Sequence, residues 1–372
     1  MTLRFHARIS EIPAQQWDAL AGNQPCLAHA FLAAMEDTHC VGPGTGWMPR
    51  HATLWEGDTL IAAAPLYAKA HSWGEYVFDW AWADAYQQHG LPYYPKWLCA
   101  LPFTPVPGTR LLARDSMARA ALLDGLLAHI DTSGVSSLHI LFANDDEIAA
   151  GAARGMLVRE GVQFHWHNNG YADFDGFLAA LAHDKRKKIR QERRKVAEAG
   201  VVLRVLEGEE ITAADWRFFV RCYTTTYALH GATPYLNLAF FRALGERLPD
   251  ACVMLLAERG SQPVAASLLL RDDTALYGRY WGAVEQIPCL HFEACYYAPI
   301  EYAIEQGLRR FEGGAQGEHK LARGLDPVRT RSLHWLRDAR FHDAVSRYLQ
   351  RETGGVELYI NELEGRRPFR QA

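Results

Sequence analysis

The sequence predicts an α/β (α+β) fold of two tandem units, each a mixed, mostly antiparallel sheet flanked by helices. The chain has 372 residues, which is long for one hydrophobic core and suits two. The same order of patterns (apolar strand, tight turn, small-residue strand, aromatic strand) occurs once in each half. Helices precede each of these segments, and a helix and a strand follow it. We expect an N-terminal domain over 1–165 and a C-terminal domain over 166–372, which includes a basic helix at 175–198.

Composition and charge exclude several classes of protein. Apolar residues make up 49% of the chain, and the net charge of −4 gives no general attraction to nucleic acid or to anionic membrane. The seven cysteines form no C-x-x-C pair and are odd in number, which favours a reducing compartment and argues against a zinc site. Met1 opens no signal-peptide pattern and no run reaches 18 apolar residues. We therefore expect a cytoplasmic protein without membrane insertion.

Periodicity and turn residues predict the elements of each half. In the first half we expect strands at 3–10, 51–56, 59–70, 76–82, 137–143 and 163–167, and helices at 13–20, 27–38 and 116–130. In the second half we expect helices at 173–198, 212–229, 238–248, 291–306 and 341–351, and strands at 252–258, 263–271, 275–284, 308–312 and 330–336.

The segment 84–110 is rich in proline and aromatic residues. Five prolines fix φ and remove backbone donors, so we expect no regular helix or central strand there. A flexible linker would be polar, whereas this segment is apolar. It is either an ordered loop that lines a cleft or an irregular cover that packs on the sheet. In the first case its candidate substrate-binding residues are Tyr93, Tyr94 and Lys96.

The segment Lys185–Lys195 holds eight cations and one acid, beside a narrow apolar stripe. Such a run is often only a solvated helix face. The alternative is a phosphate-binding face for CoA or tRNA, with Lys185, Arg186, Arg190 and Arg193 as donor-binding candidates.

The most concentrated chemistry lies in FEGGAQGEHKLARGL, residues 311–325. An acid, an imidazole and two cations surround a glycine-rich turn, and these groups suit proton transfer and anion binding. A solvated turn is the alternative. The candidates are Glu312, Gly313, Gly314, Gln316, His319, Lys320 and Arg323.

The repeated order of strands is the layout of a Gcn5-related N-acetyltransferase (GNAT) unit. The strongest similarity lies in DWAWADAY (79–86), YYPKWLCALPFTPVPGTRLL (93–112), the segment 164–196, HFEACYY (291–297) and 311–325. With these segments the chain resembles the bacterial Fem-like predicted N-acyltransferases of peptidoglycan biosynthesis or recognition, which have tandem acetyltransferase-like domains. The resemblance implies a fold and a reaction class rather than a substrate.

One stretch departs from the acetyl-CoA-dependent members of this fold. Those members carry Q/R-x-x-G-x-G/A before the helix whose N-terminus holds the pyrophosphate of CoA. Here VEQIPCLHFEACYY (284–297) has Gln286 but no glycine. The departure weakens acyl-CoA as co-substrate and fits Fem-type enzymes, whose donor is aminoacyl-tRNA. The basic helix could then receive tRNA phosphates, or equally a phosphorylated cell-wall precursor.

N-acyl transfer needs a base for the attacking ammonium, a donor for the oxyanion and an acid for the leaving group. Glu293 is the first candidate base, followed by Glu312 and His319. Tyr280 and Tyr297 are candidate acids, and Lys320 and Arg323 would hold phosphate or carboxylate.

The first hypothesis is therefore an N-acyltransferase. It would move an acyl or aminoacyl group from acyl-CoA or aminoacyl-tRNA to an amine, on a small molecule or a cell-wall precursor. A second hypothesis is a non-catalytic module that recognises peptidoglycan or another glycan through the segment 84–110. A general RNA-binding protein rests on the basic helix alone.

Overall fold

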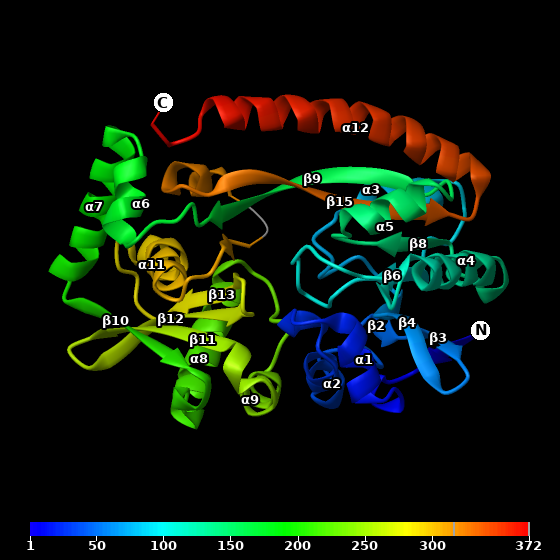
Figure 1. Cartoon of the computed structure of the whole chain (residues 1–372), viewed down its shortest axis with the longest axis horizontal. Coiled ribbons are helices and arrows are strands. Elements are labelled where there is room, and N and C mark those ends of the chain that lie inside the picture. The colour runs from blue at the N-terminus through cyan, green and yellow to red at the C-terminus, as the bar shows by residue number, and fades with distance from the viewer. Residues whose placement is uncertain (315–316, 371–372) are drawn as a thin grey trace. The chain divides into compact units, whose positions relative to one another are not determined.

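The chain forms two compact units in a computed structural model that describes residues 1–314 and 317–370 (Figure 1). Unit 1 consists of Met1–Val162 and Arg329–Tyr359, and unit 2 of Gln163–Val328 and Ile360–Ala372. With the expected boundary at 165–166, the chain would pass from the first unit to the second only once. The chain instead crosses in β9 (Leu157–His167), returns in β15 (Asp326–Leu336) and crosses again in α12 (Ala339–Gly365). Residues 329–359 thus belong to the unit that the N-terminal half begins.

Unit 1 contains the elements of the first half of the chain. Its strands are β1 (Thr2–His6), β2 (Trp47–Pro49), β3 (His51–Glu56), β4 (Thr59–Ala64), β5 (Leu66–Lys69), β6 (Lys96–Cys99), β7 (Leu112–Ala113) and β8 (Ser137–Ile140). Its helices are α1 (Ala14–Ala21), α2 (His29–Asp37), α3 (Trp80–Gln88), α4 (Ser116–Ser133) and α5 (Asp145–Ala152), with 3₁₀ turns η1 (Ile9–Glu11) and η2 (Pro25–Leu27). One sheet has the order β1-β3-β4-β7, and a second sheet includes β15-β8-β6-β5-β2.

Unit 2 holds the candidate chemistry. Its helices are α6 (Phe174–Ala180), α7 (His183–Glu198), α8 (Ala213–Leu229), α9 (Leu238–Arg247), α10 (Leu290–Phe292) and α11 (Ala298–Glu305), with the π-helical turn η5 (Glu293–Tyr297). Its strands are β10 (Val201–Glu207), β11 (Cys252–Arg259), β12 (Gln262–Arg271), β13 (Ala275–Ala283) and β14 (Arg310–Glu312), and its 3₁₀ turns are η3 (Gly208–Glu210), η4 (Pro249–Ala251) and η6 (Glu318–Arg323). The sheet order is β10-β11-β12-β13-β14-β9.

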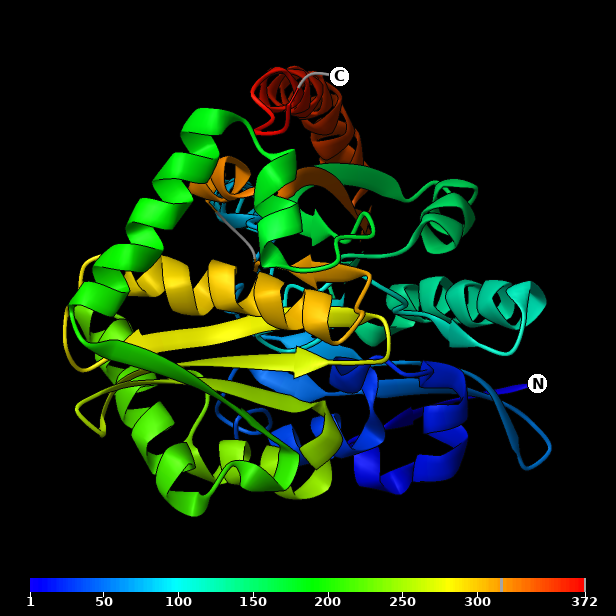
Figure 2. The same ribbon diagram turned by 60° about the vertical axis from the view of Figure 1, so that its left-hand side comes forward.

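The predicted fold class is confirmed in both units. In unit 2 every neighbouring strand pair from β10 to β14 is antiparallel except β13 with β14, which is parallel. Unit 1 repeats the exception, because β6 and β8 are parallel while β5 and β6 are antiparallel. In each unit the chain between the parallel strands contains a helix, α4 in unit 1 and α11 in unit 2. Figure 2 shows α11 lying across one face of the unit 2 strands, with α8 and α9 on the other face.

Two predictions for the first half were wrong. The aromatic strand at 76–82 is absent, and α3 begins at Trp80 instead. The segment 84–110 does contain a central strand, β6, which lies between β5 and β8. The prolines explain how it fits: Pro92 and Pro95 precede β6, and the next proline is Pro102. The strand itself is free of proline and keeps all its backbone donors.

Candidate functional site

The two parallel strands of unit 2 separate at Tyr277. β13 pairs with β14 only from Ala275 to Tyr277, and then continues to Ala283. A cavity of about 550 Å³ opens at the end of β13. The C-terminal turn of α8, the end of β13, the loop 284–290 and α10 form it. Its lining residues are Thr226, Leu229, His230, Trp281, Ala283, Glu285, Gln286, Ile287, Pro288, Leu290 and His291.

The loop 284–290 does not resemble an anion-binding helix N-terminus. Pro288 has no N–H, and the Leu290 N–H donates to the carbonyl of Ile287 over 3.2 Å. The N–H groups of Phe292 and Glu293 both donate to the carbonyl of Cys289. None of the residues that line the cavity is lysine or arginine, and Glu285 adds a carboxylate. A pyrophosphate would find few free donors and an unfavourable charge here.

Aromatic and imidazole rings form the wall beside this cavity. The His291 ring lies 5.6 Å from Trp281 and 6.3 Å from His319, between ring centroids. Tyr296 links to the same group, because its hydroxyl lies 3.0 Å from His319 Nε2. His319 is exposed, and partial desolvation together with Arg323 and Lys320 lowers its pKa. The lowered pKa favours the neutral imidazole near pH 7, and the ring is exposed to solvent.

The glycine-rich motif holds a buried lysine next to this histidine. Lys320 is 2% exposed, and its Nζ donates to the carbonyl of Gly314 over 2.9 Å. Burial lowers the pKa of Lys320 to about 8. Gly314 has φ of +83°, which favours glycine, and a Cβ at Gly313 would lie 2.6 Å from the side chain of Leu325, which would have to move. Gln316, the remaining candidate of this motif, lies outside the described residues.

Arg323 ties the motif to the basic helix α7. Its Nη2 donates to both carboxylate oxygens of Glu192, over 3.2 and 3.1 Å, and its guanidinium lies 3.5 Å from the centroid of the Phe292 ring. The hydroxyl of Tyr297 donates to the same carboxylate. Glu192, the single acid in the basic run, was not among the predicted residues. Its partner lies 131 residues away, and no local pattern signals such a pairing.

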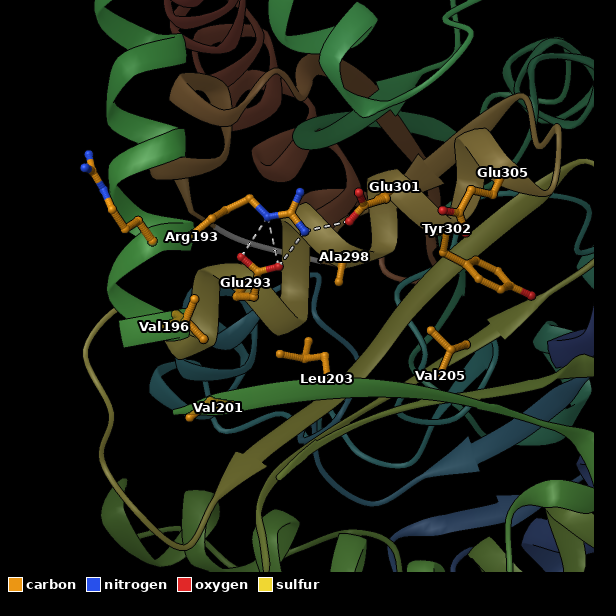
Figure 3. Close-up of a pocket in the computed structure, with 12 residues that line it drawn as sticks. Arg193, Val196, Val201, Leu203, Val205, Glu293, Ala298, Glu301, Tyr302 and Glu305 are labelled. Carbon is orange, nitrogen blue, oxygen red and sulfur yellow. Dashed lines mark hydrogen bonds and ion pairs between the residues drawn. The ribbon is translucent and has the colours of Figure 1, made fainter. Parts of the chain in front are cut away.

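Glu293, the first candidate base, faces a different cavity. Arg193 Nε donates to both of its carboxylate oxygens over 3.1 Å, and Arg193 Nη2 lies 2.6 Å from Glu301 (Figure 3). Burial raises the pKa of Glu293, and Arg193 opposes that rise. The ion pair keeps the carboxylate engaged on the side of η5 that faces α7.

The two other candidates on β13 and β14 are also engaged. Glu312 is 5% exposed and accepts from Arg310 Nε over 3.0 Å. The Tyr280 hydroxyl accepts from Arg279 over 3.1 Å, and its ring packs against Tyr223. The role of either residue in catalysis stays a prediction.

The basic helix α7 has an inner and an outer face. Three of the four predicted phosphate-binding residues contact acids: Lys185 with Asp184, Arg190 with Asp175, and Arg193 as described. The helix has further cations for which the described residues supply no ion-pair partner. One of them, Arg186, was predicted from the sequence. The others were not among the predicted residues and are exposed: Lys187, Lys188, Arg194 and Lys195. These cations form the outer face of α7, a basic surface that is not neutralised by acids of the described residues.

The unit 1 candidates belong to a buried polar cluster. Lys96 is 0% exposed, and its Nζ donates to Ser72, to Glu75 over 2.8 Å, and to Asp79. The Tyr93 hydroxyl, also buried, donates to Asp79 over 2.6 Å. Tyr94 is half-buried and bonds Ser72. All three ammonium hydrogens of Lys96 are used, so it offers none to a ligand in this conformation.

Comparison with known proteins identifies the family. A model described as peptidoglycan biosynthesis and recognition, FemAB_like, matches residues 8–371. The chain belongs to the FemAB_like family. No curated protein sequence matches this FemAB_like protein. Within the described residues, no helix is both long and apolar enough to cross a membrane.

Solved structures share the fold of this FemAB_like protein at low identity. FemX is 12% identical with a TM-score of 0.56, over 93% of this chain and 100% of FemX. L-PGS from Bacillus licheniformis is 11% identical with a TM-score of 0.52, over 86% of this chain and 96% of L-PGS. A conserved protein of unknown function from Bacteroides thetaiotaomicron is also 11% identical, with a TM-score of 0.52, over 90% and 100% of the two chains. This likeness and the parallel strand pair in each unit agree with the predicted architecture of two tandem α/β units.

Proposed function

We propose that this FemAB_like protein is an aminoacyltransferase whose unit 2 takes an aminoacyl group from aminoacyl-tRNA and passes it to an amine. The observation that carries the proposal is the outer face of α7. Lys187 and Lys188 are separated from Arg194 and Lys195 by seven residues, or about 10 Å along the helix, which spans neighbouring backbone phosphates. On the inner face of the same helix, Glu192 accepts a hydrogen bond from Arg323, which belongs to the glycine-rich motif 311–325 that also contains His319.

The cavity at the end of β13 supports the same donor. It lacks the free amides and cations that would hold the pyrophosphate of CoA, but it offers the rings of Trp281 and His291 as flat walls. In unit 1 the segment after β6, Ala100 to Val106, corresponds to the loop after β13. Its residues are all buried, so they fill the space at the end of β6. Donor binding is therefore proposed for unit 2.

The chemistry that follows is simple. The amine nitrogen attacks the ester carbonyl carbon of the donor, a C–N bond forms, and the ester C–O bond breaks. His319 would take the proton lost by the amine and return it to the departing ribose oxygen. The buried ammonium of Lys320 would stabilise the negative charge that develops on the oxyanion. Glu293 is held by Arg193, so His319 replaces it as the first candidate base.

Binding of the donor is the test. A ligand at 100 times its Kd should raise the stability by roughly 2.7 kcal/mol. We expect aminoacyl-tRNA to stabilise the protein and acetyl-CoA not to. In the double variant Lys187→Glu/Lys188→Glu, tRNA affinity at 0.1 M salt should fall at least tenfold. The slope of log K against log salt should become less steep by roughly two, one for each phosphate that the variant no longer neutralises.

A matched control is the double variant Arg347→Glu/Arg351→Glu on α12, which makes the same change in net charge at exposed positions. It should leave tRNA affinity within twofold of the unmodified protein. Stabilisation by acetyl-CoA with none by tRNA would overturn the choice of donor. An equal loss of tRNA affinity in both variants would instead mean that binding is not localised on α7.

A second candidate function is glycan recognition without transfer. It is favoured by Trp73 and Phe78 of unit 1, which are 58% and 52% exposed, because sugars stack on exposed aromatic rings. The aromatic residues of 84–110 on which this alternative first rested are mostly buried, including Tyr93 and Trp97. Turnover of aminoacyl-tRNA that is lost in His319→Gln would decide for the enzyme.

A further inference from the structure

A second cavity of unit 2, of about 490 Å³, lies between α7, β10 and the η5–α11 segment (Figure 3). It is separate from the cavity at the end of β13, with which it shares no lining residue. Neither His319 nor Lys320 lines it, and of the cations proposed to bind tRNA only Arg194 does.

The floor of this cavity is an apolar strip on β10. Val201, Leu203 and Val205 alternate along the strand and point into the cavity in Figure 3. From Val201 to Val205 the strip is about 13 Å long, at about 3.3 Å per residue. Val201 is buried, whereas Val205 at the other end is 42% exposed. The floor therefore presents uncovered apolar surface of the length of an extended alkyl chain.

The opposite wall carries an excess of negative charge. Glu293, Glu301 and Glu305 all come from the η5–α11 segment and border the cavity. The single guanidinium of Arg193 is shared between Glu293 and Glu301, so its one positive charge offsets only one of the two carboxylates. Glu305 is exposed, and it stands four residues after Glu301, a spacing at which like charges repel on a helix.

These features favour a cation over an anion as the occupant. A ligand ammonium beside Glu301 and Glu305 would relieve the repulsion between them, whereas a carboxylate or phosphate would add to it. Arg194 also lines the cavity, but even with it the carboxylates outnumber the guanidinium groups by three to two. An apolar chain attached to the ammonium would cover the valine and leucine floor, a gain in proportion to the area buried.

We propose that this cavity binds a linear aliphatic primary amine, with its ammonium between Glu301 and Glu305 and its methylene chain along Val201, Leu203 and Val205. Tyr302, which lies between the two glutamates in the sequence and also lines the cavity, gives the chain an aromatic side wall. The site takes its ligand independently of the donor, so the inference does not rest on the proposed transfer reaction.

Calorimetric titration of the full chain with 1-aminohexane tests the site. Hexan-1-ol has the same chain without the charge, and hexanoate reverses the charge. We expect saturable binding of 1-aminohexane, and binding at least tenfold weaker for both analogues. The variant Glu301→Gln/Glu305→Gln should lose at least tenfold in affinity for the amine. Val205→Ser should weaken the amine and the alcohol by the same factor, because it removes only apolar contact.

The control variant is Glu246→Gln, which removes an exposed carboxylate from α9, outside the cavity. It should bind 1-aminohexane as the unmodified protein does. Equal affinity for amine, alcohol and acid would overturn the assignment of a cation, and retention of full affinity in Glu301→Gln/Glu305→Gln would overturn the location. Binding of tRNA measured on the same preparations reports on the donor proposal separately.

Discussion

At the scale of single residues, Glu192 shows how a charge pattern can conceal a role. The residue pattern of Lys185–Lys195 predicts a basic helix, and its one acid is expected only to reduce the local positive charge. In the structure Glu192 is 7% exposed and accepts hydrogen bonds from Arg323 and Tyr297. Arg323 was predicted from the sequence to bind phosphate or carboxylate. Its partner Glu192 could not be predicted, because the pairing depends on how α7 packs against η5 and η6.

Glu192→Gln should destabilise unit 2 by about 3 kcal/mol, because it leaves the buried Arg323 guanidinium without its counter-charge. Urea unfolding measures the loss. The exposed Glu198 of the same helix is the matched control, and Glu198→Gln should change the free energy of unfolding by less than about 0.5 kcal/mol. The double variant Glu192→Met/Arg323→Met should be less destabilised than Glu192→Gln. If it is more destabilised, the ion pair itself contributes net stability.

Lys320 gives the transfer reaction an expected alkaline limit. Burial lowers its pKa to about 8, so its ammonium, and the positive potential behind the motif, is lost as the pH rises through that value. The rate of aminoacyl transfer should therefore fall above about pH 8. In Lys320→Arg the decline should move to higher pH, because arginine stays charged. An unchanged decline in that variant would assign it to another group, and Lys187→Arg on the exposed face should leave it in place.

At the scale of elements, the sequence predicted those with local signals. The hairpins β3–β4 and β11–β12 have tight turns at Gly57-Asp58 and Gly260-Ser261 between apolar strands, and both formed as predicted. The strand β6 was missed because its four residues are surrounded by prolines, and only pairing with β5 and β8 makes it a strand. The same limit applies to the predicted helix at 173–198. It is interrupted at Leu181 and Ala182, which bond to the C-terminal segment.

The packing of α8 on β13 depends on a glycine. A Cβ at Gly282 would overlap the carbonyl group of Cys222 on α8, so Gly282→Ala must push the helix away from the strand. We expect a loss of about 1–3 kcal/mol in unfolding free energy and a weaker binding of donor, since α8 also lines the cavity at the end of β13. Gly354→Ala in α12 is the opposite case. No atom lies within 4 Å of its Cβ position, and the change should stabilise the helix by about 0.5–1 kcal/mol. Denaturant unfolding compares the two variants, and equal effects would contradict the packing argument.

At the scale of the whole molecule, each unit is completed by residues distant in sequence. Unit 1 takes β15 residues from the C-terminal part of the chain, and these bring His334 opposite His139 on β8. The two Nδ1 atoms lie 2.8 Å apart, and Ser137 and Ser332 bond the two Nε2 atoms. The repeat in the sequence predicted two units and the order in which similar strands follow one another along each half of the chain. It could not predict this exchange, because nothing local marks β15 as part of the first unit.

Buried histidines in both units predict that the protein is sensitive to acid. Burial lowers the pKa of His139 in unit 1 and of His165 in unit 2 to about 3, and that of His334 to well below 6.5. Between pH 6.5 and 3 the unfolded chain binds protons that the folded units exclude, so stability is full above pH 6.5 and falls as the pH is lowered. His139 and His165 should each cost about 2 kcal/mol at pH 5, and His334 adds a cost of the same sign. Urea unfolding at pH 7.5 and pH 5 measures the difference. His139→Gln should reduce it, and the exposed His230→Gln should not. Equal stability at the two pH values would mean that these imidazoles accept protons without unfolding either unit.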